Sequence, residues 1–240
     1  MRHYISFAFL LICFSINAQN NVIKSVSEVD SIFSPKLTGG FYVQERQYQG
    51  DLFFNNKFVK SDILLSTGEM LYGELLKYNG YLDEVIWMNH TNYKQFIIDK
   101  AYISDFWTKD SLDHPAHFRR INVRDTTISH RDIFVEVVIE GKLSLYIQHQ
   151  ILCIPDEITY SSDGQARYIK TFEPMPLYYI KLPSDKYLKM HKLGRRSFLN
   201  LFPEQKKSIY RLVKKNHLNL KSVKGLIGTI DLINKESIID

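Results

Sequence analysis

Two histidines and two aspartates lie close together in one short segment of the sequence. Asp110, Asp113, His114 and His117 fall within eight residues. Imidazole and carboxylate groups bind zinc, but a site needs three or four ligands in tetrahedral geometry. Pro115 separates the two histidines, and the helical spacing His-Glu-x-x-His is missing. We therefore interpret the segment as a polar loop and predict neither a metal site nor a cofactor.

Three pairs of acidic residues have the composition that general acid–base chemistry requires: Asp83 with Glu84, Glu136 with Glu140, and Asp156 with Glu157. A glycosidase needs two carboxyl groups roughly 5 to 9.5 Å apart across a cleft. On one strand Glu136 and Glu140 would lie about 13 Å apart, and the other two pairs fall at expected turns. We interpret these acids as solvated and, since the sequence also lacks a Gly-x-Ser-x-Gly nucleophile elbow, we predict no catalytic residue.

Cys153 and a group of aromatic residues are the remaining candidates for chemistry. Cys153 lies in an apolar segment, as a buried structural thiol would. A nucleophilic cysteine needs a neighbouring histidine or cation, and His149 would be about 13 Å away along a strand. Four aromatic residues could form a sugar-stacking platform: Trp87, Tyr93, Phe106 and Trp107. In a β protein such residues pack more often as cross-strand core, which is the interpretation we favour.

Basic residues are concentrated towards the C-terminal end of the chain. Residues 19–180 hold 16 Lys and Arg against 21 Asp and Glu, whereas residues 181–224 hold 13 against 2. Helical spacing there places Ile209, Leu212 and Val213 on one face. The opposite face would carry five basic residues: Lys206, Lys207, Arg211, Lys214 and Lys215. The spacing predicts a basic amphipathic helix, and these five residues are the candidates for binding an anionic surface.

Three interpretations of this basic face compete. It can be a solvated helix surface, docked or not against the acidic remainder of the chain. It can bind an anionic partner, namely a lipid headgroup, an acidic glycan or an envelope protein. Nucleic acid is disfavoured because the chain is expected to be exported and shows no recognisable nucleic-acid-binding module.

The first residues of the chain match a cleavable secretory signal. Arg2 and His3 supply a basic start, residues 4–16 are almost wholly apolar, and the small residue Ala18 precedes a predicted cut before Gln19. The apolar run is shorter than the roughly 20 residues that cross a bilayer. We predict a signal peptide, export to the periplasm or cell envelope, and no transmembrane segment in the mature chain.

Alternating hydrophobicity indicates strands throughout the middle of the chain. The clearest case is residues 131–150, where Val135, Val137 and Ile139 alternate with polar residues before a turn at Gly141. This period of two predicts a hairpin with one face buried and one face in water. Many such segments without intervening helices predict a mainly β fold, an antiparallel β-sandwich or open barrel followed by a small C-terminal helical segment.

The connections between these strands can also be predicted. Asn79-Gly80 is the signature of a hairpin with a type I′ turn. Residues 109–117 and 155–167 are rich in polar and turn-forming residues, and we interpret both segments as long loops.

The period changes after Gly194, where apolar residues recur at helical spacing. Pro203 fits the first turn of one helix, and Ser222 the N-cap of a last helix. The predicted organisation is a signal peptide, a leader arm, a β-rich domain and a basic helical tail, with bounds 1–18, 19–37, 38–192 and 193–240.

Residues 71–79 (Leu-Tyr-Gly-Glu-Leu-Leu-Lys-Tyr-Asn), together with Asp83 and Glu84, resemble a pattern in uncharacterised exported proteins of Gram-negative bacteria. These proteins pair a β-rich body with a Lys-rich helical tail similar to residues 206–234, and the signal ending Asn17-Ala18-Gln19 is also similar. The resemblance covers most of the chain after the signal. It implies the compartment and the architecture, but it implies no activity and no catalytic residues.

These observations lead to one principal hypothesis, one alternative, and a third possibility, namely a subunit of a larger envelope assembly. The principal hypothesis is a non-catalytic binding or scaffolding protein of the periplasm or cell envelope. The alternative is a hydrolase acting on envelope polymers, with its site in the segment 109–117. The alternative requires His114, His117 and an acid to converge in one cleft.

Overall fold

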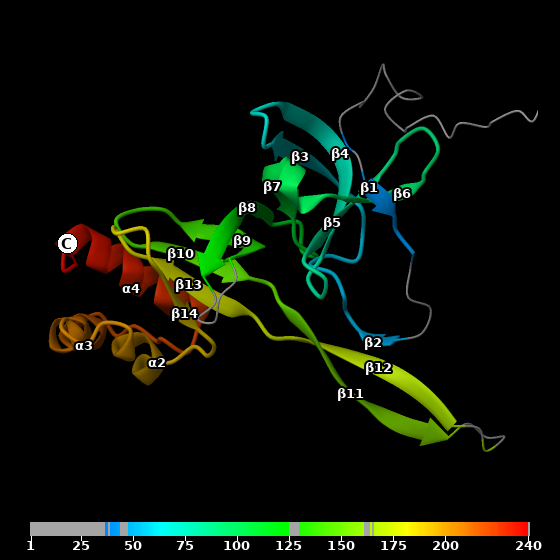
Figure 1. The fold of residues 1–240 in the computed structure, drawn as a ribbon. Coiled ribbons are helices and arrows are strands. Elements are labelled where there is room, and N and C mark those ends of the chain that lie inside the picture. Colours follow the sequence, from blue (N-terminus) through cyan, green and yellow to red (C-terminus); the bar gives the residue numbers. More distant parts are fainter. Residues whose placement is uncertain are drawn as a thin grey trace, which may run out of the picture. The chain divides into compact units, whose positions relative to one another are not determined.

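The computed structural model describes residues 37, 39–43, 48–124, 130–160, 164 and 166–239. The predicted signal peptide and almost all of the predicted leader arm lie outside these residues. The described chain is mainly β and ends in a group of helices, which confirms the predicted fold class (Figure 1). Within the described residues, no helix is both long and apolar enough to cross a bilayer.

Most strands belong to one antiparallel sheet of eleven strands, in the order β1-β6-β5-β4-β3-β7-β8-β9-β10-β13-β14. In chain order these strands are β1 (Gly39–Phe41), β3 (Val59–Leu65), β4 (Met70–Asn79), β5 (Glu84–Met88), β6 (Gln95–Ile98), β7 (Ile103–Lys109), β8 (Pro115–Arg124), β9 (His130–Ile139), β10 (Ser144–Gln148), β13 (Leu177–Lys181) and β14 (Tyr187–Met190). A short 3-10 helix, η1 (Lys100–Tyr102), joins β6 to β7.

A second sheet of three strands contains the segment that we expected to be the longer loop. Its strands are β2 (Tyr48–Gly50), β11 (Ile151–Tyr160) and β12 (Ala166–Pro174), with β2 parallel to β12. The prediction of a loop over 155–167 is therefore wrong. Pro155 falls where the β11–β12 register shifts, between Ile154 and Glu157. A proline is tolerated at such an irregularity because the ladder does not need its missing N–H.

Two other connections also differ from the predictions. The loop over 109–117 is shorter than expected, because β7 continues to Lys109 and β8 begins at Pro115. Asn79 does end a hairpin strand, but four residues rather than two separate β4 from β5, so the turn is not type I′. The Asn79 side-chain oxygen accepts hydrogen bonds from the backbone N–H groups of Tyr81 and Leu82, at 3.0 and 3.1 Å. The asparagine thus stabilises a longer turn.

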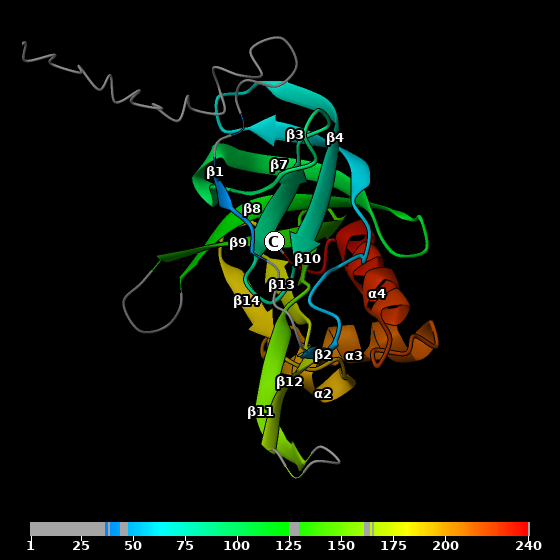
Figure 2. The same ribbon diagram turned by 90° about the vertical axis from the view of Figure 1, so that its right-hand side faces the viewer.

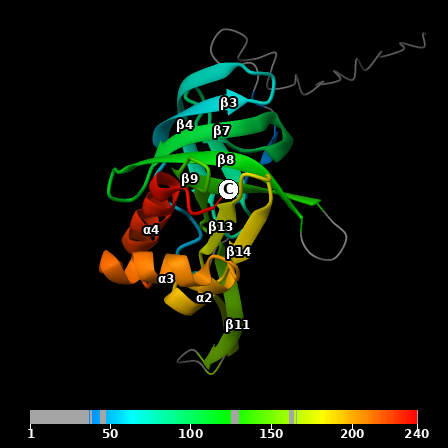
Figure 3. The same ribbon diagram turned by 90° about the vertical axis from the view of Figure 1, so that its left-hand side faces the viewer.

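Three helices follow the last strand, α2 (Arg195–Asn200), α3 (Lys206–Lys215) and α4 (Val223–Glu236). Ser222 caps α4 as predicted, since its hydroxyl oxygen accepts a hydrogen bond from the Gly225 N–H at 3.1 Å. Leu226, Ile230 and Ile233 of α4 share one core with side chains of β10, β13 and β14. The helices lie together on one side of these strands (Figures 2 and 3), so the predicted tail is packed as part of the fold.

Strand β10 departs from the expectation of one wet face. All five of its residues are buried. Leu145 and Ile147 pack in the core shared with the helices, whereas Tyr146 packs on the other face with Val135 and Tyr179. Both faces are covered because helices lie on one face and the strands around β10 curl over the other. An alternating pattern reports which residues share a face, but it does not report what covers each face.

Candidate functional site

The basic face predicted at residues 206–215 is present on α3. Ile209, Leu212 and Val213 are buried, and all five predicted basic side chains are exposed: Lys206, Lys207, Arg211, Lys214 and Lys215. Within the part of the chain that the structure describes, none of the five forms an ion pair with a carboxylate. Among the described residues, the one hydrogen bond that their side chains make runs from Lys206 Nζ to Asn200 Oδ1, at 3.3 Å. The cations are therefore not engaged by the fold itself.

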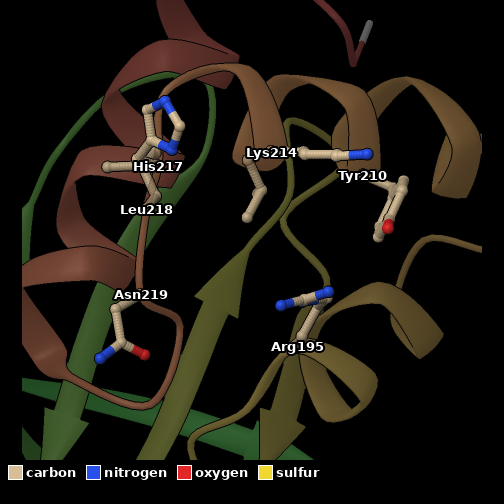
Figure 4. Close-up of a pocket in the computed structure, with 7 residues that line it drawn as sticks. Arg195, Tyr210, Lys214, His217, Leu218 and Asn219 are labelled. Carbon is tan, nitrogen blue, oxygen red and sulfur yellow. The ribbon is translucent and has the colours of Figure 1, made fainter.

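A groove of about 370 Å³ lies beside this face, between α2, α3 and the connection from α3 to α4. Its lining residues are Arg195, Tyr210, Val213, Lys214, His217, Leu218 and Asn219. Figure 4 shows the Arg195 side chain reaching towards α3, with Tyr210 and Lys214 on that helix and His217 and Asn219 on the connection. The Arg195 guanidinium carbon lies 5.7 Å from the centre of the Tyr210 ring, within the range of a cation–π contact. Of the residues that the structure describes, no acidic side chain lines the groove.

The end of α3 fixes His217 at the edge of the groove. The backbone N–H groups of His217 and Leu218 donate to the carbonyls of Lys214 and Val213, at 3.3 and 3.1 Å. His217 has a φ of 51°, in the left-handed region that helix C-termini commonly adopt and that glycine usually fills. The backbone conformation alone would favour glycine at this position, so a histidine lowers the stability of the fold.

Asn219 is held by the start of the next helix. Its side-chain oxygen accepts a hydrogen bond from the Lys221 N–H at 3.0 Å, and its carbonyl oxygen accepts one from the Ser222 N–H at 3.1 Å. A Cβ atom at Gly225 would lie 2.0 Å from that carbonyl oxygen, so only glycine permits this close approach. These contacts hold Asn219 at the edge of the groove that it lines.

The groove combines groups that bind anions. The guanidinium, ammonium and amide groups of Arg195, Lys214 and Asn219 donate hydrogen bonds, and the first two also carry positive charge. Such donors form charge-assisted hydrogen bonds with carboxylate, sulfate and phosphate groups. The Tyr210 ring adds a flat apolar surface on which a sugar ring can stack. The arrangement can therefore hold an anionic group and a ring next to it.

Sequence reasoning found only part of this groove. Of the five predicted residues, only Lys214 lines it, and the other four extend the positive charge along α3. The remaining polar lining residues were missed: Arg195, Tyr210, His217 and Asn219. The helical spacing of Tyr210 and Lys214, four residues apart, was available as a signal. The contribution of α2 depends on how two helices pack, which the local pattern does not encode.

The two histidines of segment 109–117 do not converge on one site. His114 Nδ1 lies 3.1 Å from Asp110 Oδ2 in an exposed turn. His117 Nε2 lies 2.7 Å from Asp105 Oδ1, and its ring stacks on Trp107 with 4.6 Å between the ring centres. Across the described ranges, no three or more His, Cys, Asp or Glu side chains are placed to hold a metal ion.

Glu136 and Glu140 do not converge on one site. Glu136 Oε2 lies 2.6 Å from His149 Nε2, whereas Glu140 pairs with Arg119. Asp83 is not solvated as expected, because its side chain is 3 % exposed and pairs with Lys100. The side chains of Asp156 and Glu157 lie outside the described residues.

The aromatic residues and Cys153 behave largely as core. Trp87 and Phe106 are each 1 % exposed and Tyr93 is 71 % exposed, so these residues do not form one platform. The indole N–H of Trp87 donates to Glu74 Oε2 at 2.6 Å, deep in the protein. Cys153 is a free thiol, half-buried against an apolar cluster rather than fully buried.

Comparisons of the chain with protein-family models, curated proteins and solved structures gave no match.

Proposed function

We propose that this chain is an exported, non-catalytic binding protein of the periplasm or cell envelope, and that its helical region binds an acidic glycan. The observation that carries the proposal is the groove between α2 and α3, which Arg195, Lys214 and His217 line without any acidic residue. The unpaired cations along α3 continue this positive field. Neighbouring like charges repel each other, and a bound polyanion relieves that repulsion.

An acidic glycan fits this region better than a lipid surface does. An interfacial helix binds a bilayer by inserting its apolar face. On α3 that face is Ile209, Leu212 and Val213, all buried in the core shared with the sheet. What α3 offers to a partner is charge, together with a concave groove that contains the Tyr210 ring. A sugar ring with a carboxylate matches both features.

The alternative function, a hydrolase with its site at residues 109–117, has no support from the geometry. Its condition was the convergence of His114, His117 and an acid. The two imidazoles contact different aspartates, Asp110 and Asp105. The proposal therefore remains one of binding.

Titration with a fluorescently labelled oligogalacturonate tests the proposed function. The double substitution Arg195→Ala/Lys214→Ala removes two charge-assisted donors, and we expect affinity at low salt to fall roughly tenfold or more. Binding of the unsubstituted protein should also weaken steeply as the NaCl concentration rises from about 50 to about 300 mM, because salt screens exposed charges.

The matched control is Lys57→Ala/Lys60→Ala, which removes the same charge from two exposed lysines outside the groove. This control should keep most of the affinity. Equal losses in the two double variants would contradict the proposal. So would binding to phosphatidylglycerol vesicles without binding to the glycan, since the partner would then be a lipid surface.

A further inference from the structure

A second and larger cleft, of about 820 Å³, lies on the face of the large sheet that the helices do not cover. Val123 of β8 and Lys189 of β14 both line it, although these strands stand four places apart in the sheet order. In a flat sheet four strand spacings amount to about 19 Å. The five strands from β8 to β14 therefore curl around the cleft.

The strand register places the cleft residues on one face of the sheet. Tyr179 is paired with Tyr146 on one side and with Lys189 on the other, and paired residues point to the same face. Tyr146 and Tyr179 belong to the apolar cluster of that face, whereas their neighbours Leu145 and Ile180 belong to the core shared with the helices. The cleft and the α3 groove consequently lie on opposite faces of β10 and β13.

The floor of the cleft is apolar and its rim is basic. Apolar side chains from four strands and one connection line it: Val123, Ile133, Leu152, Met175 and Leu177. Four exposed basic or histidine side chains stand at its rim: Arg131, Lys186, Lys189 and His191. Asp185 is the one acidic lining residue, and its carboxylate pairs with Lys181 Nζ at 2.8 Å. The rim therefore carries a net positive charge.

One polar side chain is buried in the wall of the cleft. Gln148 is 4 % exposed, and its Oε1 atom accepts a hydrogen bond from the Tyr179 hydroxyl at 3.2 Å. Gln148 also lines the cleft, so its side-chain amide can donate a hydrogen bond to a bound molecule. Gln148 is one of several polar side chains in the lining, with Gln150 and Ser184.

We propose that this cleft binds an amphiphilic anion, a molecule with one apolar chain and an acidic headgroup. The chain would lie on the Ile133 and Leu177 floor, an oxygen of the ligand would accept from the Gln148 amide, and the headgroup would lie among the rim cations. The volume falls in the range of about 300 to 1,000 Å³ typical of small-molecule sites. This site is additional to the glycan groove and does not depend on it.

Calorimetric titration with laurate below its micellar concentration tests the site. We expect saturable binding of one laurate per chain, and no comparable binding of dodecyltrimethylammonium, which has the same chain and the opposite charge. Lys186→Glu/Lys189→Glu should weaken laurate binding by about tenfold or more. The control Lys57→Glu/Lys60→Glu, which reverses the same number of charges elsewhere, should change it by less than about twofold.

A second variant tests the apolar part of the cleft. Met175 is 52 % exposed, so Met175→Trp can fill space without disturbing the core, and laurate affinity should fall. Equal laurate affinity in all variants, or uptake without saturation, would overturn the proposal. The Arg195→Ala/Lys214→Ala variant separates the two functions, because it should lose the glycan and keep laurate.

Discussion

Basic side chains have different surroundings in two regions of the molecule. At the start of η1, Lys100 Nζ lies 2.5 Å from Asp83 Oδ2, and the aspartate is almost fully buried. On α3, five basic side chains are exposed and no described carboxylate pairs with them. A buried charge must have a partner within the protein, because desolvation is costly. The α3 cations meet no such requirement, so burial does not explain their number, whereas the proposed binding of an acidic glycan would.

The Asp83 cluster connects three parts of the large sheet. Asp83 precedes β5 and has a left-handed φ of 57°. Its carboxylate accepts hydrogen bonds from the Tyr78 hydroxyl of β4 at 2.7 Å and from the Phe134 N–H of β9 at 3.2 Å. Burial raises the pKa of Asp83, and Lys100, Tyr78 and Phe134 limit that rise by stabilising the ionised form. The charged groups of this cluster thus stabilise the fold by joining β4, β5 and β9.

Removing one cation from each region should affect the stability of the fold very differently. Lys100→Met leaves the Asp83 carboxylate buried without its countercharge, and we expect a loss of about 3 kcal/mol in the free energy of unfolding at pH 7. Lys207→Met on α3 should change it by less than about 0.5 kcal/mol. Urea denaturation measures both. Similar values for the two variants would remove the distinction between the regions.

The pH dependence of the Lys100→Met variant sharpens this test. A carboxyl group whose pKa is higher in the folded protein than in the unfolded chain favours folding at low pH, and this advantage is lost as pH rises through the folded pKa. Without Lys100 the pKa of Asp83 should rise further. The deficit of the variant should therefore be largest at neutral pH and smaller at pH 4.5.

The pKa of Asp105 is shifted in the opposite direction to that of Asp83, and we expect a smaller effect on stability. Burial alone would raise the pKa of its carboxyl group, but hydrogen bonds from Ser104, Arg119 and His117 outweigh burial and hold the pKa below its ordinary value of 3.8. An acid with a lowered pKa stabilises the folded state above its unfolded pKa, and this stability is lost as pH falls through the folded pKa.

Asp105→Asn should accordingly cost about 1 to 2 kcal/mol at pH 7. The variant should also lose less stability than the unsubstituted protein as pH falls below about 4. The control is Asp231→Asn, which removes an exposed carboxylate paired with Lys235 on α4 and should cost under about 0.5 kcal/mol. Acid titrations followed by circular dichroism compare the three proteins, and parallel curves would contradict the assignment.

The sequence predicted elements whose pattern is local and missed features that depend on distant neighbours. Helix α3 was predicted from Ile209, Leu212 and Val213, because a single amphipathic helix contains its own signal. The first three residues of strand β8 were predicted as the end of a loop, and the rest of the strand was not recognised as one. Its buried residues Phe118 and Ile121 are three residues apart and therefore lie on opposite faces of the strand. This spacing breaks the period of two that indicates a strand.

In the candidate sites, too, the local features could be predicted and the features that depend on distant residues could not. The five basic residues of α3 could be predicted because they are close in sequence. The groove also needs Arg195 from another helix, and the cleft needs strands from β8 to β14 to curl around Gln148. The expectation of a wet face on β10 failed for this reason. Whether a polar residue such as Gln148 faces solvent or a cleft is decided by the curvature of the whole sheet.

The smallest predicted effect concerns His217, where the stability and binding roles of one residue can be separated. Its φ of 51° is a conformation that glycine adopts without steric cost. His217→Gly should therefore leave the free energy of unfolding unchanged or raise it by up to about 1 kcal/mol. Glycan affinity should fall by about threefold, or roughly 0.6 kcal/mol, because the imidazole donor leaves the groove.

His217→Asn is the matched control, because asparagine also tolerates the left-handed conformation and keeps a hydrogen-bonding side chain. We expect its glycan affinity to lie between those of the unsubstituted protein and the glycine variant. Thermal unfolding and glycan titration of the three proteins check both quantities. A glycine variant that loses stability and keeps its affinity would mean that the imidazole serves packing at the end of α3. The polar contacts to the glycan would then come from Arg195, Lys214 and Asn219 without His217.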